Sequence, residues 1–277
     1  MADRRAEAFV PGHITGLFTV HRTDDPETTG SSGAGVTLSQ GVTVSLHPDQ
    51  RFDVTVDGKP ASVESIDRVL EALAVDAAVS VETDLPLGRG FGLSGGMALG
   101  TALAANEAFG LARSENELIR IAHVAEVEAG TGLGDVVGQA RGGLPIRLEP
   151  GPPPHGSMDG IPAAGRVEYL SFGDLSTPEV LAERPRIITS AGESALETLL
   201  EETTRKRFME ASHDFADEVG LLTPELESII DTVKANGGRA SMAMLGRTVF
   251  ALGTDLSDAG YDPGVANVHV AGASLRE

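Results

Sequence analysis

The segment Leu85-Pro86-Leu87-Gly88-Arg89-Gly90-Phe91-Gly92-Leu93-Ser94-Gly95-Gly96 lies directly before a helix that the sequence predicts from Gly95 to about Phe109. Its alternate glycines free the backbone to turn N–H groups toward one point, and the start of a helix adds partial positive charge there. These features predict a cradle for an anion, for which phosphate is the best fit. A tight turn before a close-packed helix explains the glycine spacing equally well. Neither common nucleotide fingerprint is present, because there is no Gly-x-x-x-x-Gly-Lys-Ser/Thr and Leu93 stands at the third glycine of the dinucleotide pattern.

A second group of residues, His123, Glu126 and Asp135, suits a site for a metal and a hydroxyl. His123 and Glu126 are three residues apart on a predicted helix that begins with a capping-box pattern at Ser114, so they share a face. Asp135 follows the glycine-rich run 130–134, which can fold the chain back toward that face. Two carboxylates beside a phosphate cradle suit a Mg²⁺ ligand and a group that positions or deprotonates a hydroxyl. The alternatives are a solvated helix face for Glu126 and a helix N-cap for Asp135.

Two segments rich in glycine and hydroxyl groups predict loops suited to a small polar substrate. They are residues 11–18, which follow a short predicted strand, and residues 31–35, which include Ser31. Arg147 is a candidate clamp for a substrate carboxylate, because its planar guanidinium suits bidentate pairing. Loops that only turn the chain, and an ordinary surface arginine, explain these features as well.

The alternation of predicted strands and helices, without regular βαβ spacing, indicates an α+β fold. The apolar patterns predict strands over 6–10, 36–46, 75–82, 167–172, 186–190 and 248–253. Alternation through Phe52, Val54 and Val56 predicts a further strand before a hairpin turn at Asp57-Gly58. Besides the two helices named above, helices are predicted over 62–74, 193–218 and 224–235. The Pro- and Gly-rich segment 149–165 predicts a boundary between two domains.

The 277-residue chain contains 41 Asp and Glu against 21 Lys and Arg, which gives a formal net charge of −20. This balance excludes a basic surface that holds nucleic acid and disfavours a polybasic membrane anchor. Apolar residues make up 41% of the chain, which favours a folded protein, and a folded chain this acidic is typical of a very salty cytoplasm. There is no cysteine, no apolar signal core and no run of about 18 apolar residues. We therefore expect a soluble, cytoplasmic protein without disulfides or thiolate sites.

The segment 86–94 resembles the central phosphate-binding motif of the GHMP kinases, and the segment 8–16, Ala-Phe-Val-Pro-Gly-His-Ile-Thr-Gly, resembles their first motif. The stretch 86–96 differs from the usual central motif of the family in having one serine, Ser94, in place of two, and glycines at 95 and 96 in place of alanines. More narrowly, four segments resemble the archaeal pantoate kinases, namely 11–16, 31–35, 132–136 and 240–246. These segments are spread from one end of the chain to the other.

The resemblance implies a two-domain GHMP kinase fold with the active site in the cleft between the domains. The expected domains are an N-terminal ATP-binding domain, residues 1–150, and a C-terminal α+β domain, residues 163–277. The implied reaction transfers the γ-phosphoryl group of ATP, with Mg²⁺, to the 4-hydroxyl of (R)-pantoate, a step toward coenzyme A. The habit of the family also implies a homodimer.

The resemblance further implies roles for individual residues. Ser94 and Glu126 would hold Mg²⁺ and handle the phosphates, and Asp135 would face the acceptor hydroxyl as a base or as an electrostatic orienter. Pantoate would be held by Ser31, His123 and Arg147, with Arg147 as the partner of its carboxylate. The residues expected to bind ATP lie in the central motif: Pro86, Gly88, Gly90, Gly92, Ser94 and Gly95. The third motif of the family is glycine-rich, whereas residues 238–244 of this chain are poorer in glycine.

Two other functions are consistent with these sequence features. A sister kinase of the same superfamily, acting on homoserine, shikimate or mevalonate, would have the same phosphate-handling residues and a different acceptor pocket. A nucleotide-binding regulatory module would need the cradle but not a carboxylate that faces a hydroxyl. The presence of both Glu126 and Asp135 argues against such a module.

Overall fold

The computed structural model describes residues 5–48, 53–173 and 185–276. Its larger sheet is built on two long antiparallel strands, β1 (Ala6–Phe18) and β2 (Gly33–His47). Among the described residues the strand order is β12–β1–β2–β5–β3–β4, and β6 and β7 continue from β2. The other strands are β3 (Asp53–Val56), β4 (Lys59–Pro60), β5 (Ala78–Thr83), β6 (Leu144–Arg147), β7 (Met158–Ile161) and β12 (Ser274–Arg276).

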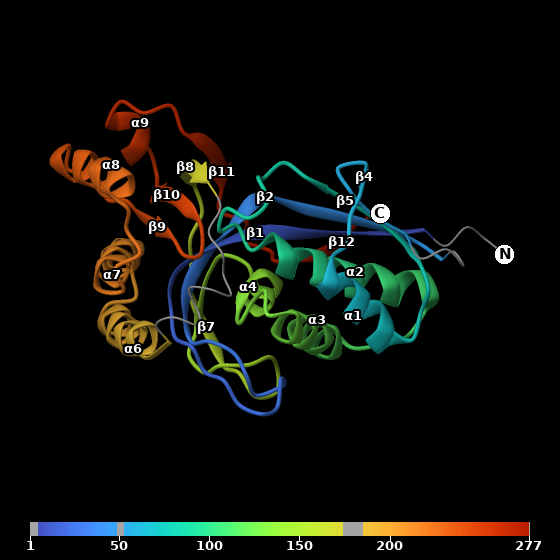
Figure 1. Cartoon of the computed structure of the whole chain (residues 1–277). Helices are drawn as coiled ribbons and strands as arrows, with labels where there is room; N and C mark the ends of the chain where they lie inside the picture. Colours follow the sequence, from blue (N-terminus) through green and yellow to red (C-terminus); the bar gives the residue numbers. More distant parts are fainter. Residues whose placement is uncertain (1–4, 49–52, 174–184, 277) are drawn as a thin grey trace.

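Four helices cover one face of this sheet and lie below its strands in Figure 1. They are α1 (Glu64–Leu73), α2 (Leu93–Phe109), α3 (Glu115–Ala129) and α4 (Asp135–Arg141). The predicted capping box begins α3, because Ser114 accepts from the backbone of Glu117 and the Glu117 side chain accepts from the backbone of Ser114. Glycines bring α2 close to the sheet: a Cβ at Gly96 would lie 2.9 Å from Val42 Cγ2, and one at Gly100 would lie 2.6 Å from Val44 Cγ2.

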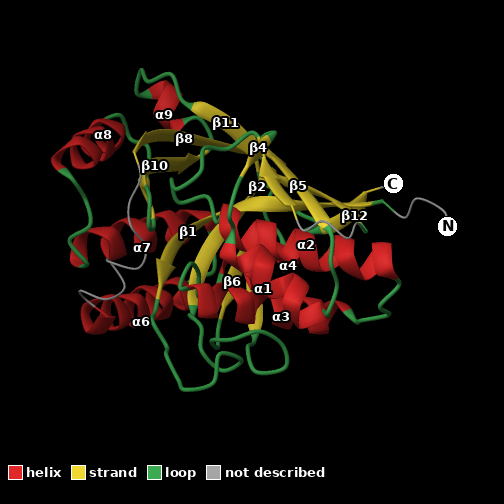
Figure 2. Ribbon diagram, turned by 45° about the vertical axis from the view of Figure 1, so that its right-hand side comes forward, coloured by secondary structure: helices red, strands yellow, loops and turns green. Residues whose placement is uncertain are grey.

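A second, smaller sheet lies in the same part of the molecule as the remaining helices (Figure 2). Among the described residues its order is β11–β8–β10–β9, with β8 (Arg166–Gly173), β9 (Ser241–Ala243), β10 (Arg247–Leu252) and β11 (Gly264–Asn267). The remaining helices are α6 (Pro185–Glu201), α7 (Arg205–Glu218), α8 (Pro224–Ala235) and α9 (Asp255–Asp258). The last three contact strands of the smaller sheet, whereas α6 packs against α7 and β1. The α+β fold predicted from the sequence is confirmed.

Strand β1 belongs to both parts of the molecule. Its first half pairs with β12 and β2 in the larger sheet, and its second half packs against α7. There the rings of Phe18 and Phe215 meet edge to face at 5.6 Å between centroids. A Cβ at Gly16 would lie 2.9 Å from the Phe208 ring, so the close approach of α7 requires glycine at that position.

Several predicted elements differ from the structure. Residues 11–18 are not a loop but the continuation of β1, and β2 already begins at Gly33. Pro11 is accommodated because the β1–β2 register shifts between Pro11 and Gly12. Residues 186–190 are helical rather than extended, because Ile188 lies on the same buried face of α6 as Ala191 and Leu199.

The single helix predicted over 193–218 is two helices. Residues 202–204 are not helical and separate α6 from α7. Thr204 caps the start of α7, because its side chain accepts a hydrogen bond from the backbone N–H of Arg207. The strand predicted through Phe52 is described from Asp53 onward, and Phe52 itself lies outside the described residues. The division into domains 1–150 and 163–277 stays a prediction. Strand β12, near the C-terminal end, pairs with β1 in the larger sheet, so this last strand lies beside the first part of the chain. Within the described ranges, no helix combines the length and the apolar character needed to cross a bilayer.

Candidate active site

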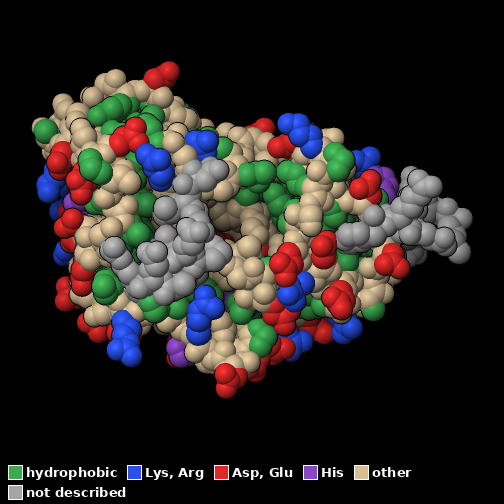
Figure 3. Space-filling view, viewed as in Figure 1, with side chains coloured by type: hydrophobic (Ala, Val, Ile, Leu, Met, Phe, Trp, Pro, Cys, Tyr) green, Lys and Arg blue, Asp and Glu red, His purple; other side chains and the backbone are tan. Residues whose placement is uncertain are grey.

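The predicted cradle lines a cavity of about 390 Å³ that opens near the middle of the face drawn in Figure 3. Residues Leu87 to Gly95 all line this cavity. Three glycines of the segment have positive φ, with values of 73° at Gly88, 84° at Gly90 and 62° at Gly92, and Gly92 is the N-cap of α2. Glycine is therefore required by the turn itself, and the N-terminus of α2 points at the space that the turn encloses.

The backbone of the cradle is anchored from three sides. The buried Gln139 side chain on α4 donates to the carbonyls of Gly92 and Pro11, at 2.9 Å each. The backbone N–H of His13 donates to the carbonyl of Phe91 at 2.9 Å. From the smaller sheet, the Thr248 hydroxyl donates to the carbonyl of Arg89 at 2.8 Å. These contacts leave the turn little freedom, so its shape is set before any ligand arrives.

The segment 240–246 forms part of the wall of the cavity. Met244 and Leu245 line the cavity, and the N–H of Met244 donates to the carbonyl of Thr15 at 2.9 Å. Gly246 lies so close to the backbone of Arg89 and Gly90 that a Cβ would collide with it. The one glycine that this turn needs is therefore at 246, just beyond the glycine-poor run.

Glu126 on α3 and Ser94 at the start of α2 form the first polar pair of the cavity. The Ser94 hydroxyl donates to Oε1 of Glu126 at 2.6 Å, and the Thr131 hydroxyl donates to the same oxygen at 2.9 Å. Glu126 is 2% exposed and has no cationic partner among the described ion pairs. Burial raises the pKa of Glu126 to about 7, against the opposing hydrogen bonds from Ser94 and Thr131.

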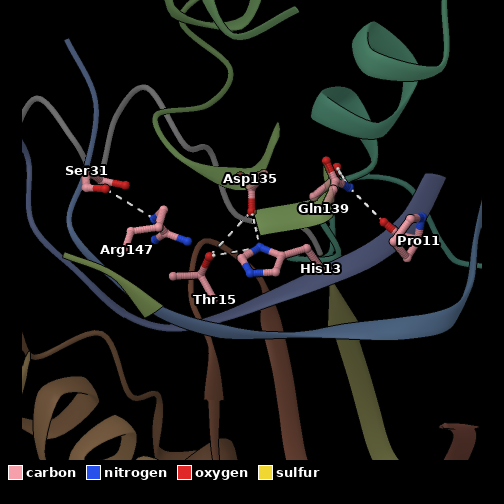
Figure 4. Close-up of polar contacts among 8 residues, drawn as sticks. Pro11, His13, Thr15, Ser31, Asp135, Gln139 and Arg147 are labelled. Atoms are coloured by element: carbon pink, nitrogen blue, oxygen red, sulfur yellow. Dashed lines mark hydrogen bonds and ion pairs between the residues drawn. The ribbon is translucent and has the colours of Figure 1, made fainter. Parts of the chain in front are cut away.

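Asp135, the first residue of α4, lies beside this pair. A Cβ at Gly132 would be 2.7 Å from Oε2 of Glu126 and 3.7 Å from Oδ2 of Asp135, so the glycine-rich run does bring the two carboxylates together. Oδ1 of Asp135 meets Nδ1 of His13 at 2.7 Å and the Thr15 hydroxyl at 3.4 Å (Figure 4). Burial works to raise the pKa of Asp135, but the contact with His13 and the charge of Arg147 outweigh it and hold the pKa below its ordinary value.

Arg147 on β6 is a buried cation at the other side of the cavity, 2% exposed. Its Nε donates to the carbonyl of Ser31 at 3.2 Å (Figure 4). Its Nη1 is buried and has no hydrogen-bond partner among the described residues. Gly134 permits this arrangement, because a Cβ there would lie 2.6 Å from Nε of Arg147. A guanidinium held in this way has N–H groups that could donate hydrogen bonds to an anion inside the cavity.

Family models and known proteins match most of the chain. The model of the GHMP kinase N-terminal domain matches residues 62–143, and the model of the C-terminal domain matches residues 196–260. The pantoate kinase of Thermococcus kodakarensis is 40% identical over 266 residues, which cover 90% of this chain and 87% of that protein. The pantoate kinase of Methanocaldococcus jannaschii is 35% identical over 251 residues, covering 88% and 91%. The chain belongs to the GHMP kinase family.

A solved structure is similar to this GHMP kinase over its whole length. It is described as a phosphotransferase related to the coenzyme A biosynthesis pathway, and it covers 98% of each chain with a TM-score of 0.88 and 32% identity. The two-domain α+β fold expected from the family resemblance is thereby confirmed.

The fold of this GHMP kinase brings most of the predicted site residues to one cavity. Those that line it are Ser31, Gly88, Gly90, Gly92, Ser94, Gly95, Glu126, Asp135 and Arg147. Pro86 and His123 are not among the lining residues. The ring of His123 is buried, and its Nε2 donates to the carbonyl of Thr29 at 2.8 Å, so it holds the chain two residues before Ser31. The roles assigned to these residues stay predictions.

Sequence reasoning missed several residues of the site. His13 and Thr15 belong to the segment 8–16, but a loop predicted at 11–18 does not indicate where their side chains point. In a strand, alternate residues share a face, and His13 and Thr15 both reach Asp135. Gln139 follows Asp135 by one helical turn, a spacing that could have indicated that both face the cradle.

Proposed function

We propose that this chain catalyses the ATP-dependent phosphorylation of (R)-pantoate at its 4-hydroxyl, which yields 4-phosphopantoate and ADP in coenzyme A biosynthesis. The observation that carries the proposal is the pairing, in one cavity, of a buried Arg147 that has an unused donor with an Asp135 held ionised. Pantoate has a carboxylate that could pair with Arg147 and a primary hydroxyl that could face Asp135. The names of the similar pantoate kinases support the same acceptor.

The lining of the cavity also suits the rest of the acceptor. Phe18 and Leu133 line the same cavity as Ser31 and Arg147. Pantoate has two methyl groups between its carboxylate-bearing carbon and its 4-hydroxyl. Apolar side chains next to a carboxylate clamp therefore match the order of apolar and charged groups along the substrate.

The residues near Ser94 fit a magnesium ion. A hydroxyl and a buried carboxylate 2.6 Å apart, without a cationic partner among the described residues, are oxygen donors of the kind Mg²⁺ prefers, and Mg²⁺ is commonly held by one or two carboxylates plus substrate phosphates. No group of three or more His, Asp or Glu within the described part of the chain could hold a metal alone. Bound by Ser94, Glu126 and the phosphates, Mg²⁺ would neutralise phosphate charge.

In the proposed reaction the acceptor oxygen forms a bond with the γ-phosphorus while the bond between that phosphorus and the β,γ-bridging oxygen breaks. ADP leaves with the electron pair, and the hydroxyl proton passes to Oδ2 of Asp135. The cradle of residues 88–95 and the N-terminus of α2 hold the phosphates in line. Such a transfer asks the protein chiefly for positioning and for electrostatic stabilisation. The cytoplasmic location, the homodimer and the adaptation to high salt stay predictions.

The test is ADP release from Mg-ATP in molar KCl with pantoate, homoserine, shikimate and mevalonate as separate acceptors. We expect release with pantoate alone. Release with another acceptor would make the chain a sister kinase, and no acceptor-dependent release would favour a binding module.

Asp135→Asn tests the role of the carboxylate, because it keeps the shape of the side chain and removes its charge. We expect turnover to fall by about 100-fold or more, as for loss of a positioned general base, while ATP binding measured by calorimetry stays within about threefold. Unchanged turnover in this variant would remove Asp135 from the mechanism.

A further inference from the structure

His13 is a buried histidine in the active site that the proposed reaction does not yet use. It lies on β1, is 1% exposed, and faces Asp135 across the gap between β1 and α4 (Figure 4). Two glycines make room for its ring: a Cβ at Gly138 would be 3.0 Å from Nε2, and a Cβ at Gly35 would collide with the same atom. The ring is thus held in one orientation, with Nδ1 toward the carboxylate.

The contacts of the ring identify its protonation state. An ionised carboxylate can only accept hydrogen bonds, so the 2.7 Å contact with Oδ1 requires the proton to be on Nδ1. Nε2 is buried and has no partner among the described residues. A doubly protonated ring would bury a second N–H without an acceptor, and burial together with the charge of Arg147 lowers the pKa of His13. The neutral Nδ1–H tautomer satisfies these contacts.

The two oxygens of Asp135 therefore have different surroundings. Oδ1 accepts from His13 and, at 3.4 Å, from the Thr15 hydroxyl. Oδ2 accepts no hydrogen bond among the described residues, and it lies 3.7 Å from the place where a Cβ on cavity-lining Gly132 would be. The Asp135 side chain is 24% exposed, although the side chain of His13 in contact with it is fully buried. The exposed part of the carboxylate therefore opens on the cavity.

We propose that His13 is a positioning residue for phosphoryl transfer: its Nδ1–H holds Oδ1 of Asp135 and thereby leaves Oδ2 to receive the acceptor hydroxyl. Without this bond the carboxylate can rotate about its last torsion, and the two oxygens become equivalent. The inference rests on the proposed function for the role of Asp135 but not for the identity of the acceptor. Besides His13, the charged or titratable groups that face Asp135 are Arg147 from β6 and Glu126 from α3.

Two variants separate this role from mere packing. In His13→Asn the amide nitrogen takes the place of Nδ1 and keeps the donor, whereas His13→Leu fills a similar volume without a donor. We expect His13→Leu to lower kcat by about 10- to 100-fold, the effect of a misplaced reacting group, with the KM for ATP within about threefold. His13→Asn should retain most of kcat. Equal losses in both variants, or a loss confined to KM, would overturn the proposal.

A double-mutant cycle with Asp135→Asn decides whether His13 acts through Asp135. If it does, adding His13→Leu to Asp135→Asn should lower kcat by less than about twofold further, since the interaction is already lost. Multiplicative losses would contradict the proposal. The cycle uses whichever acceptor the chain phosphorylates, so a wrong acceptor assignment does not affect it.

A spectroscopic measurement tests the protonation state of His13 even if no acceptor is found and turnover cannot be measured. Two-dimensional ¹H–¹⁵N spectra of the ¹⁵N-labelled wild-type chain distinguish the two neutral histidine tautomers, and the signal absent from His13→Asn identifies His13. We expect the Nδ1–H tautomer in the wild type at pH 7 to 8. An Nε2–H tautomer or a doubly protonated ring would overturn the inference even if no acceptor were known.

Discussion

Arg147 is a cation that the fold buries without an ion-pair partner among the described residues. Burying a charge costs stability unless the charge is paired and hydrogen-bonded, so removal of an unpaired one also removes this cost. The nearby charge of Asp135 compensates in part, because it works against the lowering of the Arg147 pKa by burial. A substrate carboxylate would supply the missing partner, so function and stability make opposite demands on this residue.

Arg147→Met tests this conflict, because it keeps an unbranched apolar stem and removes the charged guanidinium. We expect the KM for pantoate to rise by about 100-fold, in line with the loss of a charge-assisted bidentate pair at about 1.5–3 kcal/mol, with the KM for ATP within about threefold. Thermal unfolding should show a Tm no more than a few degrees below that of the wild type. Arg113→Met, at an arginine whose side chain is 52% exposed, is the matched control and should change neither KM. Equal increases in both KM values would make Arg147 a structural or nucleotide-linked residue.

Glu126 predicts a pH dependence of stability in the metal-free protein. Burial raises its pKa from the ordinary value of 4.5 to about 7 in the folded state, so the folded state binds this proton more tightly than the unfolded state does. The free energy of unfolding should therefore fall as the pH rises from about 5 to 8, by up to about 1.4 kcal/mol per pH unit within that window.

Glu126→Gln removes this titration. In EDTA and at constant KCl, denaturant titrations at pH 5 and pH 8 should show that the variant gains stability relative to the wild type as the pH rises. An identical pH dependence of the two proteins would show that Glu126 titrates normally.

At the scale of elements, the cradle is a turn that needs its glycines for two separate reasons. Gly92 has a φ of +62°, which strains other residues, and its missing Cβ leaves space beside Asp135 and His13. A Cβ there would lie 3.1 Å from Oδ1 of Asp135 and 3.2 Å from the carbonyl of His13. The turn therefore shapes both the proposed phosphate side of the cavity and the space beside Asp135.

Gly92→Ala and Gly237→Ala separate the two reasons. Gly237 has a φ of +83° and no atom within 4 Å of its would-be Cβ, so alanine there meets only the backbone strain. Both variants should lose about 1–2 kcal/mol of stability in denaturant titrations. Only Gly92→Ala should also lose turnover, by roughly 10-fold or more, because it displaces Asp135. Similar turnover in the two variants would show that the space beside Gly92 is not needed.

The elements that the sequence predicted well are those with local signals. The capping box of α3, the turn at Asp57-Gly58 and the start of α8 at Pro224 depend on residues a few positions apart. The strand predicted wrongly over 186–190 lacks such a signal. Ile187 and Ile188 suggest a strand by composition, but the buried face of α6 that holds Ile188 exists only because α7 and β1 pack there.

At the scale of the whole molecule, the net charge of −20 applies to a protein whose proposed substrates are also anions. At 0.1 M salt the Debye length is about 10 Å, so repulsion acts across the cavity, whereas at 1 M it is about 3 Å and only local contacts count. Acidic side chains are visible on several parts of the face in Figure 3.

We therefore expect activity to require high salt. Raising KCl from 0.1 M to 2 M should increase the Tm and lower the KM for both ATP and pantoate, because screening weakens self-repulsion and substrate repulsion together. Sucrose at matched osmolality is the control and should not lower the KM values. Highest activity at low salt would contradict the prediction.

Some properties of this protein follow from the sequence by itself. The spacing of Gly88, Gly90 and Gly92 before a helix predicted the anion cradle, and the run 130–134 predicted that Glu126 and Asp135 converge. Both predictions concern residues joined by a short piece of chain, whose geometry is limited by local sterics. The excess of acidic residues likewise predicts, without a structure, that no basic surface holds nucleic acid.

Other properties were decided only by the tertiary structure. His13 and Asp135 are 122 residues apart, and Ser31 and Arg147 are 116 residues apart, so no local spacing predicts their contact. They meet because β1 and β2 pair along their whole lengths, β6 adds to β2, and α4 packs across β1. Such contacts depend on which apolar faces are buried together, a property of the whole chain. The local sequence therefore determined the glycine-rich turn, and the packing of distant strands decided which side chains meet in the cavity beside it.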